Sequence, residues 1–552
     1  MAFDAEIGTR PGWSRHSVAG REVWVAGYVL IGARTLTGAD AAACLAALPT
    51  DPAALVKALR GLDGHFAAVV GAAGGVLWAA TDVIASTPLF LSRTSGRAVV
   101  SDDPRRLATE PPSRCLDPEA ALGLAISGFT TGPRTLHRHV ARLSPGQVAL
   151  PTADGAEVRS YRVYLPQPET ESPARREARL ADLLLGLFER LRDGASGRPI
   201  VVPLSAGLDS RLIVSALHHV GAKDVRCFAY GQPGNHEAIA SRAIAEHLGL
   251  PWTFVPYSLD RQRAALASPA HDAYWDVAET WSATPFEQDF LAIRDLRASG
   301  WLPDEALLVN GQSGDFITGG HVPPALAAPL PGLTAEQRLD RVVDALVAKH
   351  YALWTSLHTA DHLASLRQQV ADDLAARGLA EVPEDMPHAA YELSEYDNRQ
   401  AKYVVPGQRV YDFFGIDWRL PLWDAALVDF YATVPATDKL GQVLYRRVLE
   451  SRNWGGVWQG WRTERTIVPG WIRPLRQAAR AACAPLGRHR WHALERRLFA
   501  YHMDPLLNMA PQPWARVAAD RRGYRNAISW ITEAYLNRHG LRWDGRPRGD
   551  QP

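Results

Sequence analysis

PIVVPLSAGLDSR, at residues 199–211, is the stretch from which the fold of this chain can be read. The apolar run at its start predicts a buried parallel strand, and the amphipathic residues 212–217 after it predict a helix. A short turn of small residues joins the two. The first N–H groups of a helix are unpaired and carry partial positive charge, so such a turn can bind a phosphate or pyrophosphate. The alternative is an ordinary strand-to-helix turn rich in small residues.

The turn carries one acid, Asp209, and a carboxylate beside phosphates suits a bridging divalent cation. It is not a Walker A loop, because the GxxxxGK[ST] pattern is absent and the turn contains no lysine. It resembles the SGGxDS pyrophosphate loop of the asparagine synthetase class of ATP-pyrophosphatases, which form acyl-adenylates. The resemblance assigns nucleotide binding to Leu204, Ser205, Ala206, Gly207, Leu208, Asp209 and Ser210.

A second Gly-rich turn, NGQSGDFITGG, occupies residues 310–320. It is similar to the family's SGEGxDExxGG segment and places Asp315 at the acid that helps to hold magnesium. The resemblance implies a Mg²⁺ site made by Asp209 and Asp315 that bridges the triphosphate of ATP, with Asn310 and Gly311 beside the nucleotide. Two such loops in the family's order favour this interpretation over two unrelated turns.

Three residues depart from the family pattern. Gln312 and Phe316 replace two glutamates, and Ala206 replaces the first glycine of the pyrophosphate loop, where its Cβ narrows the space. These changes favour a carboxylate substrate other than free aspartate. Nucleotide binding is expected to persist, because Asp209 and Asp315 are retained.

Alternating strands and helices surround the first turn. Strands are predicted at 225–230 and 252–256, with a helix at 238–248 between them and a leucine-striped helix at 176–192 before the turn. This order predicts a doubly wound parallel sheet that binds ligands at the carboxyl ends of its strands. Tyr230 lies at such an end, and the matching position in the family borders the adenine through its backbone. The chain beyond residue 334 is expected to be helical.

Residues 20–165 predict an α+β region with mostly antiparallel strands. Strands are expected at 22–30, 65–70, 75–80 and 98–101, and one or two helices at 41–62 with Asp40 as the N-cap. The stretches GLDGHF at 61–66 and RLSPG at 142–146 resemble parts of the N-terminal glutamine amidotransferase domain of asparagine synthetases, which has an Ntn-like fold.

A working glutaminase of that type uses a cysteine directly after the initiator methionine, whose own amine is the base. This chain has Ala2 there, the family's Asn-Gly-Glu stretch is missing, and the four cysteines lie elsewhere, at Cys44, Cys115, Cys227 and Cys483. We therefore expect no glutamine hydrolysis. The nitrogen donor would be a separate glutaminase, free ammonia or an amine on the substrate, and the domain would serve as a scaffold or a partner interface.

The stretch GIDWRLPLWD at 415–424 is similar to the family's GlEvRvPfLD segment. Asp417 stands at the family's glutamate and would orient or deprotonate the nitrogen nucleophile, or else form a buried ion pair with Arg419. In the family, a basic residue beyond the helix matching 444–449 stabilises charge on the adenylate. The candidates are Arg462 and Arg465, with Arg465 preferred.

The composition excludes several classes of protein. With 552 residues, 47% of them hydrophobic and 22% charged, the chain has the profile of a soluble protein with two or more domains. The net charge of +1 does not favour nucleic-acid binding, and no apolar run predicts a membrane span. Scattered cysteines and the lack of a signal-peptide pattern favour a cytoplasmic location.

Together these patterns predict an α/β and α+β multidomain protein. An Ntn-like glutamine amidotransferase-type domain without the N-terminal cysteine is expected at 1–165 and a linker at 166–177. An asparagine synthase-type ATP-pyrophosphatase domain, with an adenine nucleotide α-hydrolase-like fold and a helical C-terminal part, is expected at 178–540, before a tail at 541–552.

The implied reaction converts a carboxylate and MgATP into an acyl-adenylate and pyrophosphate, after which ammonia or an amine attacks to give an amide. The sequence variants resemble most the amidotransferases found beside surface-polysaccharide genes. The alternatives are a ring-closing synthetase of the β-lactam or lasso-peptide type and a nucleotide-binding scaffold without turnover. The oligomeric state stays open and is compatible with a homodimer.

Overall fold

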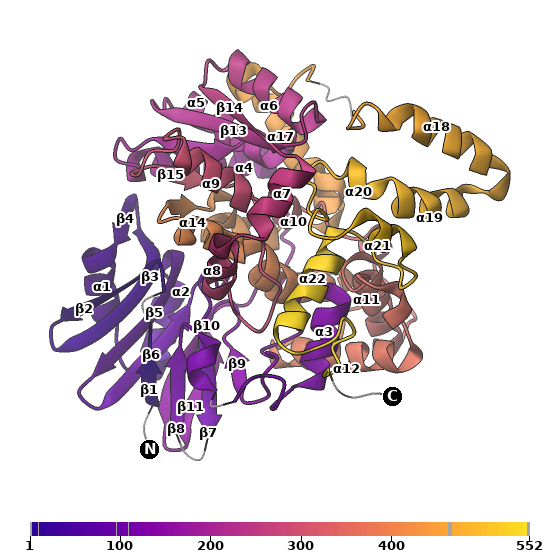
Figure 1. Cartoon of the computed structure of the whole chain (residues 1–552). Helices are drawn as coiled ribbons and strands as arrows, with labels where there is room; N and C mark the ends of the chain where they lie inside the picture. The colour runs from indigo at the N-terminus through magenta and orange to yellow at the C-terminus, as the bar shows by residue number, and fades with distance from the viewer. Residues whose placement is uncertain (1–2, 9, 95–96, 109, 462–465, 549–552) are drawn as a thin grey trace.

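The computed structural model describes residues 3–8, 10–94, 97–108, 110–461 and 466–548 (Figure 1). It is a mixed α/β structure with three sheets. Two of them lie in the N-terminal part and the third lies in the part that carries both Gly-rich loops.

The larger N-terminal sheet has seven antiparallel strands. Its strands are β11 (Gly155–Ser160), β10 (Gln147–Thr152), β6 (Gly75–Thr81), β5 (Asp63–Ala72), β3 (Arg21–Ile31), β2 (Trp13–Val18) and β4 (Arg34–Thr37), which pairs with β3. The smaller sheet has the order β1 (Phe3–Glu6), β8 (Arg97–Ser101), β7 (Phe90–Thr94) and β9 (Val140–Arg142). The four predicted strands are confirmed as β3, β5, β6 and β8. The other strands of the two sheets were not foreseen: β1, β2, β4, β7, β9, β10 and β11.

Successive side chains of β5 point to opposite faces of the larger sheet, and because nearly all of them are apolar, each face has its own hydrophobic core. Phe66, Ala68 and Val70 pack with helices α1 (Gly38–Ala46) and α2 (Pro52–Arg60). Ala67 and Val69 pack with residues of the smaller sheet. The prediction of Asp40 as N-cap was wrong: Thr37 precedes the helix, and Asp40 lies in its first turn, where its charge still favours the positive helix end.

The third sheet is the predicted parallel one, with the strand order β14-β13-β12-β15-β16. Its strands are β12 (Ile200–Pro203), β13 (Val225–Gly231), β14 (Trp252–Pro256), β15 (Leu307–Val309) and β16 (Asp417–Arg419). Helices α4 (Pro173–Gly194), α5 (Leu208–His219), α6 (His236–His247) and α9 (Phe290–Ala298) connect or accompany them. Helix α4 begins at Pro173, so residues 173–177 of the predicted linker are helical.

The chain beyond residue 334 is mostly helical, as predicted, and further helices lie before it. The helices not yet named are α3 (Pro118–Ser127), α7 (Leu259–Leu266), α8 (Pro269–Val277), α10 (Gly314–Ile317), α11 (Ala335–Lys349), α12 (Ala360–Ala376), α13 (Pro387–Ser394), α14 (Arg409–Phe413), α15 (Ala425–Ala432), α16 (Ala436–Lys439), α17 (Val443–Arg452), α18 (Ile472–Cys483), α19 (Arg488–Leu498), α20 (Ala500–Met503), α21 (Trp514–Ala519) and α22 (Ala527–Arg538). Helices α18 and α19 project from the rest of the molecule as a hairpin (Figure 1). No helix among the described residues is both long and apolar enough to cross a membrane.

The predicted tail is in part well packed. Leu541 is fully buried, and it forms a β-bridge with Pro547. The backbone N–H of Arg548 donates to Gly540 O at 2.9 Å. Residues 541–548 are therefore folded against the rest of the chain.

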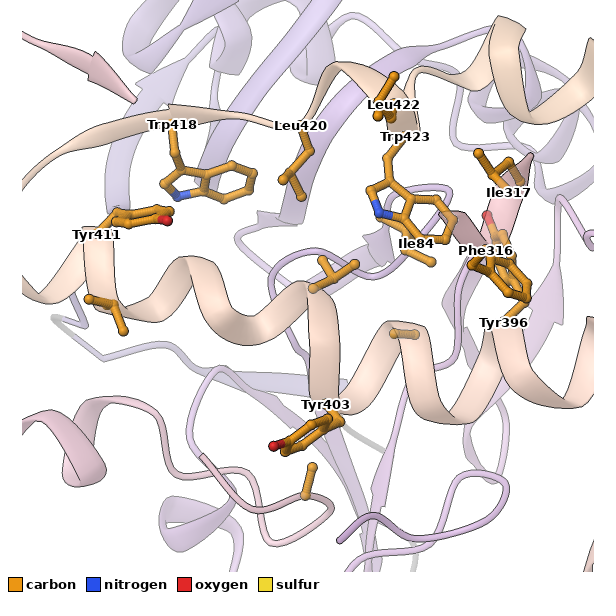
Figure 2. Close-up of a cluster of buried hydrophobic side chains, with 14 of the residues drawn as sticks. Ile84, Phe316, Ile317, Tyr396, Tyr403, Tyr411, Trp418, Leu420, Leu422 and Trp423 are labelled. Carbon is orange, nitrogen blue, oxygen red and sulfur yellow. The ribbon is translucent and has the colours of Figure 1, made fainter. Parts of the chain in front are cut away.

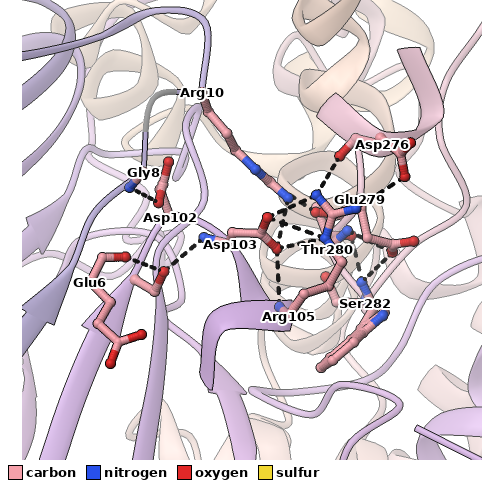
Figure 3. Close-up of polar contacts among 12 residues, drawn as sticks. Glu6, Gly8, Arg10, Asp102, Asp103, Arg105, Asp276, Glu279, Thr280 and Ser282 are labelled. Atoms are coloured by element: carbon pink, nitrogen blue, oxygen red, sulfur yellow. Dashed lines mark hydrogen bonds and ion pairs between the residues drawn. The ribbon is translucent and has the colours of Figure 1, made fainter. Parts of the chain in front are cut away.

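Charged side chains join the N-terminal part to the end of α8 and to the segment after it (Figure 3). The carboxylate of Asp103 forms ion pairs with the guanidinium groups of Arg10 at 3.0 Å and Arg105 at 2.8 Å. Arg105 also reaches Asp276 at 3.0 Å, and Arg10 donates to Glu279 O at 3.1 Å. These contacts fix the start of the chain against the helical part.

The π-helical segment η4 (Glu395–Val404) connects both halves through buried hydrogen bonds. The ammonium of Lys402 donates to Thr130 O at 2.8 Å, and the backbone N–H of Gly132 donates to Asn398 Oδ1 at 2.8 Å. Arg142 donates to Ala401 O at 2.7 Å. π-helical segments are rare and are frequently found at functional sites.

Candidate functional site

The first loop leaves β12 and enters α5, as the sequence predicts. Gly207 caps this helix without a side-chain hydrogen bond, so its first N–H groups are not capped by a side chain. The N–H of Ser205 donates to Ser210 Oγ at 3.0 Å, and that of Ala206 donates to a carboxylate oxygen of Glu237 at 2.6 Å. One backbone donor of the loop thus already binds an anionic oxygen, which is the interaction that a phosphate would make.

The second loop follows β15 and brings Asp315 to Asp209, although 106 residues separate them in sequence. The N–H of Asp315 donates to Asp209 Oδ2 at 2.9 Å, and Tyr445 donates its hydroxyl proton to Asp209 Oδ1 at 3.2 Å. A Cβ on Gly314 would lie 2.4 Å from Asp209 Cγ, so only glycine fits there. The two acids predicted to share a cation are therefore neighbours.

The two neighbouring carboxylates, Asp209 and Asp315, have pKa values that are shifted in opposite directions. Burial, and then repulsion from Asp315, raises the pKa of Asp209 to about 7. Burial opposes ionisation of Asp315 as well, but its hydrogen bond and charge interaction with His321 outweigh this and lower its pKa. The side chain of Asp315 is 54% exposed and open to a ligand.

This donor set fits Mg²⁺, which prefers hard oxygen ligands and binds proteins through one or two carboxylates plus substrate phosphates. A divalent cation would relieve the repulsion that raises the pKa of Asp209. Asp209 and Asp315 are the residues that would hold it.

Asn310 and Gly311 lie where β15 meets the first loop. Asn310 donates its side-chain N–H to Tyr411 Oη at 2.8 Å and accepts the N–H of Gln312 at 2.9 Å. A Cβ on Gly311 would come within 3.0 Å of the backbone of Asp209 and Ser210. Glycine at 311 therefore allows the two loops to approach each other.

Phe316, one of the departures from the family pattern, is 1% exposed and belongs to an aromatic cluster beneath the loop (Figure 2). Its ring stacks on Trp423 with 6.0 Å between centroids and lies 6.3 Å from Tyr396. An ionised glutamate would be costly at this buried apolar position, so the replacement of that acid is a packing adaptation.

Tyr230 is the residue before last of β13, and its hydroxyl donates to Asp289. The Gln288 side chain donates to Tyr230 Oη at 3.1 Å and also lines a cavity that is open to solvent. Arg399 and Arg525 line the same cavity together with two acids, Glu287 and Asp504, and apolar side chains of the C-terminal helices. The cavity therefore lies next to the strand end that was predicted to border the adenine.

The structure does not bring Asp417 to this site. Asp417 is the first residue of β16 and pairs in register with Leu307, the first residue of β15, so it lies at the amino edge of the sheet. Its carboxylate contacts Arg198 at 2.8 Å, whereas the guanidinium of Arg419 lies over the Tyr28 ring at 3.9 Å. The alternative expectation, an ion pair between Asp417 and Arg419, is therefore wrong, because each of the two side chains contacts another residue. Arg462 and Arg465 lie outside the described residues.

Three residues near Asp315 were not predicted from the sequence to belong to the site. His321 Nε2 lies 2.9 Å from Asp315 Oδ2, its Nδ1 contacts Glu395, and His350 Nε2 lies 3.0 Å from Glu395 Oε2. Burial opposes protonation of His321, but hydrogen bonds to Asp315 and Glu395 outweigh it and raise its pKa. Only the position of His321, directly after the second loop, offered a signal in the sequence.

Residues 191–452, which include both loops and η4, match the family described as asparagine synthase. Both loops and the two neighbouring acids thus lie within a stretch that is similar to asparagine synthase, which supports an ATP-dependent, amide-forming synthetase domain. The match covers a little under half of the chain, and over this stretch the chain is similar to asparagine synthase.

Proposed function

We propose that the protein activates a substrate carboxylate as an acyl-adenylate, releases pyrophosphate and forms an amide with ammonia or an amine. The observation that carries this proposal is the meeting of Asp209 and Asp315 between two Gly-rich loops at the carboxyl edge of a parallel sheet. The first loop, with Ser205, Gly207 and Ser210, would bind the pyrophosphate part of ATP. Mg²⁺ held by the two acids would offset the charge of the phosphates.

We also propose that the N-terminal domain is an Ntn-like scaffold without glutaminase activity. Residue 2 is alanine in the sequence. Cys227 is buried in β13, and burial raises its pKa to about 12, which makes it a poor nucleophile. Cys44 lies in α1, and burial raises its pKa as well. A nitrogen donor from outside the chain or on the substrate fits these facts.

The cavity beside Tyr230 is our proposed site for the carboxylate substrate. The guanidinium of Arg525 has its pKa lowered by burial and by the nearby charges of Arg399 and Arg496. Like charges held close together attract an anion, and guanidinium groups bind carboxylates in a bidentate manner. The apolar lining, which includes Phe286, favours a substrate larger than free aspartate.

ATP–pyrophosphate exchange without a nitrogen donor tests the proposal. The panel consists of aspartate, nucleotide-linked uronic acids and carboxyl-bearing peptides. We expect exchange with one class of acid, and we expect Asp315→Asn to abolish it. The matched control is Asp182→Asn, which removes an exposed carboxylate on α4.

Two outcomes would contradict the proposal. Tight MgATP binding without exchange for any acid would favour a nucleotide-binding scaffold. Pyrophosphate exchange that persists in the Asp315→Asn variant would show that Asp315 is not needed to hold the cation. If exchange occurs and the product is a cyclised form of the same molecule, the ring-closing alternative is correct.

A further inference from the structure

A group of two histidines and one glutamate lies beside the two acids and has no role in the proposed reaction. His321 follows the second loop, His350 follows α11, and Glu395 begins η4. One ligand atom from each side chain lies within 4.8 Å of the other two. We propose that His321, His350 and Glu395 bind a divalent transition-metal cation such as Zn²⁺ or Mn²⁺, at a site separate from that of Mg²⁺.

The strongest observation is the state of the Glu395 carboxylate. Its side chain is 0% exposed, and among the described residues no contact to its Oε2 meets hydrogen-bond geometry, although an imidazole nitrogen lies within ion-pair distance. A buried carboxylate oxygen without a partner is costly. His350 Nε2 faces it at 3.0 Å. Two ligands of one tetrahedral zinc ion are about 3.3 Å apart when each bond is about 2.0 Å long, so a cation between these atoms needs only a small adjustment.

The chemistry of the donors selects the class of cation. A neutral imidazole offers a ring-nitrogen lone pair to a metal ion, and a carboxylate offers an oxygen. Two imidazoles and one carboxylate suit Zn²⁺, Mn²⁺, Fe²⁺ or Co²⁺, whereas Mg²⁺ and Ca²⁺ prefer oxygen ligands alone. The site thus differs in ligand type from the neighbouring pair of Asp209 and Asp315.

The orientation of His321 gives independent support. Its Nδ1 faces Glu395 Oε1, and its Nε2 lies 2.9 Å from Asp315 Oδ2. Histidines that bind a metal usually donate their other ring N–H to a carboxylate, which fixes the ring. Arg399, 3.6 Å from Glu395 Oε1 and 29% exposed, would turn away toward solvent when a cation binds.

Such a cation would hold His321 and, through it, the side chain of Asp315. This consequence rests on the proposed function, because it concerns the residue assigned to Mg²⁺. Binding of the cation itself does not depend on that assignment and can be measured without ATP.

The test uses the full-length protein, treated with a chelator and then dialysed against Zn²⁺ in the absence of Mg²⁺ and ATP. We expect one equivalent of retained zinc by elemental analysis, and Co²⁺ in its place should give the visible absorption of a four- or five-coordinate site. His350→Ala and Glu395→Gln should each weaken binding by about 100-fold or more. His271→Ala is the matched control: it removes a buried histidine that contacts one carboxylate, Glu287, at 2.7 Å, and zinc should be retained.

Wild-type protein that retains no stoichiometric zinc and shows no Co²⁺ absorption would overturn the proposal, and this result does not depend on how any variant folds. Equal retention by His350→Ala would overturn it too. Asp209→Asn separates the two cation sites: retention supports a separate site, whereas loss would place the cation between Asp209 and Asp315 instead. These outcomes are independent of pyrophosphate exchange, so failure of the proposed reaction would not be confused with failure of this site.

Discussion

The substitution Gly314→Ala tests the geometry on which the site depends. The new Cβ would lie 2.4 Å from Asp209 Cγ and 2.4 Å from Leu422 Cδ1. Ordinary contact begins near 3.4 Å, so the carboxylate must move by about 1 Å. Leu422 can rotate, but Asp209 is held by the Asp315 N–H at 2.9 Å and by Tyr445 at 3.2 Å. The carboxylate cannot move away without weakening both hydrogen bonds.

The magnitude follows from these contacts. Overpacking of a core typically costs about 1–3 kcal/mol of folding free energy. A hydrogen bond or ligand contact to a charged group is worth about 1.5–3 kcal/mol, which corresponds to binding of MgATP that is about 10- to 100-fold weaker. Isothermal titration calorimetry measures this affinity, and circular dichroism verifies the fold.

The matched control is Gly74→Ala, because an added Cβ there meets no atom within 4 Å and the backbone is not left-handed. It should bind MgATP like the wild type. The reasoning is refuted if folded Gly314→Ala binds MgATP within about threefold of the wild type, since a displaced Asp209 would then cost less than one such contact.

Three further predictions concern stability. Lys439→Met breaks a fully buried pair with Glu392 at 3.1 Å and should cost about 3–5 kcal/mol in urea unfolding, whereas adding Glu392→Leu should recover much of this loss. Asp82→Ala leaves the N–H groups of Phe66 and Ile84, which the carboxylate accepts at 2.8 Å, without a partner; the free energy of unfolding should fall by about 2 kcal/mol or more, and an unchanged urea midpoint would contradict this. Burial opposes ionisation of Glu279, but His539 and hydrogen bonds outweigh it and hold the pKa at about 2 instead of 4.5. The unfolded chain therefore takes up this proton first, so stability should fall as the pH drops from 4.5 toward 2, and Glu279→Gln should make that fall shallower in a pH series of urea titrations.

The parallel sheet and both of its loops could be predicted, because strand periodicity, small-residue turns and loop order are local properties of the sequence. The meeting of Asp209 and Asp315 followed from the rule that parallel strands end at one edge of a sheet. The short strand β16 was not foreseen, because three residues carry no detectable period. Its register is what sends Asp417 to the opposite edge.

The histidine and glutamate group could not be predicted for a different reason. His350 and Glu395 come from two helices whose packing brings them together, and no spacing along the chain records that contact. The role of Phe316 was likewise hidden: the sequence showed a lost negative charge, whereas the structure shows a ring that fills an aromatic cluster (Figure 2).

The segment η4 sets a limit on how this protein can be dissected. Its residues belong to the synthetase domain, yet Lys402 and Asn398 have partners at Thr130 and Gly132, and Tyr396 donates to Val83 O at 2.6 Å. Expression of residues 191–452 alone would leave these buried groups facing water or one another. We therefore expect residues 191–452 not to fold on their own, because the N-terminal region supplies part of their interior.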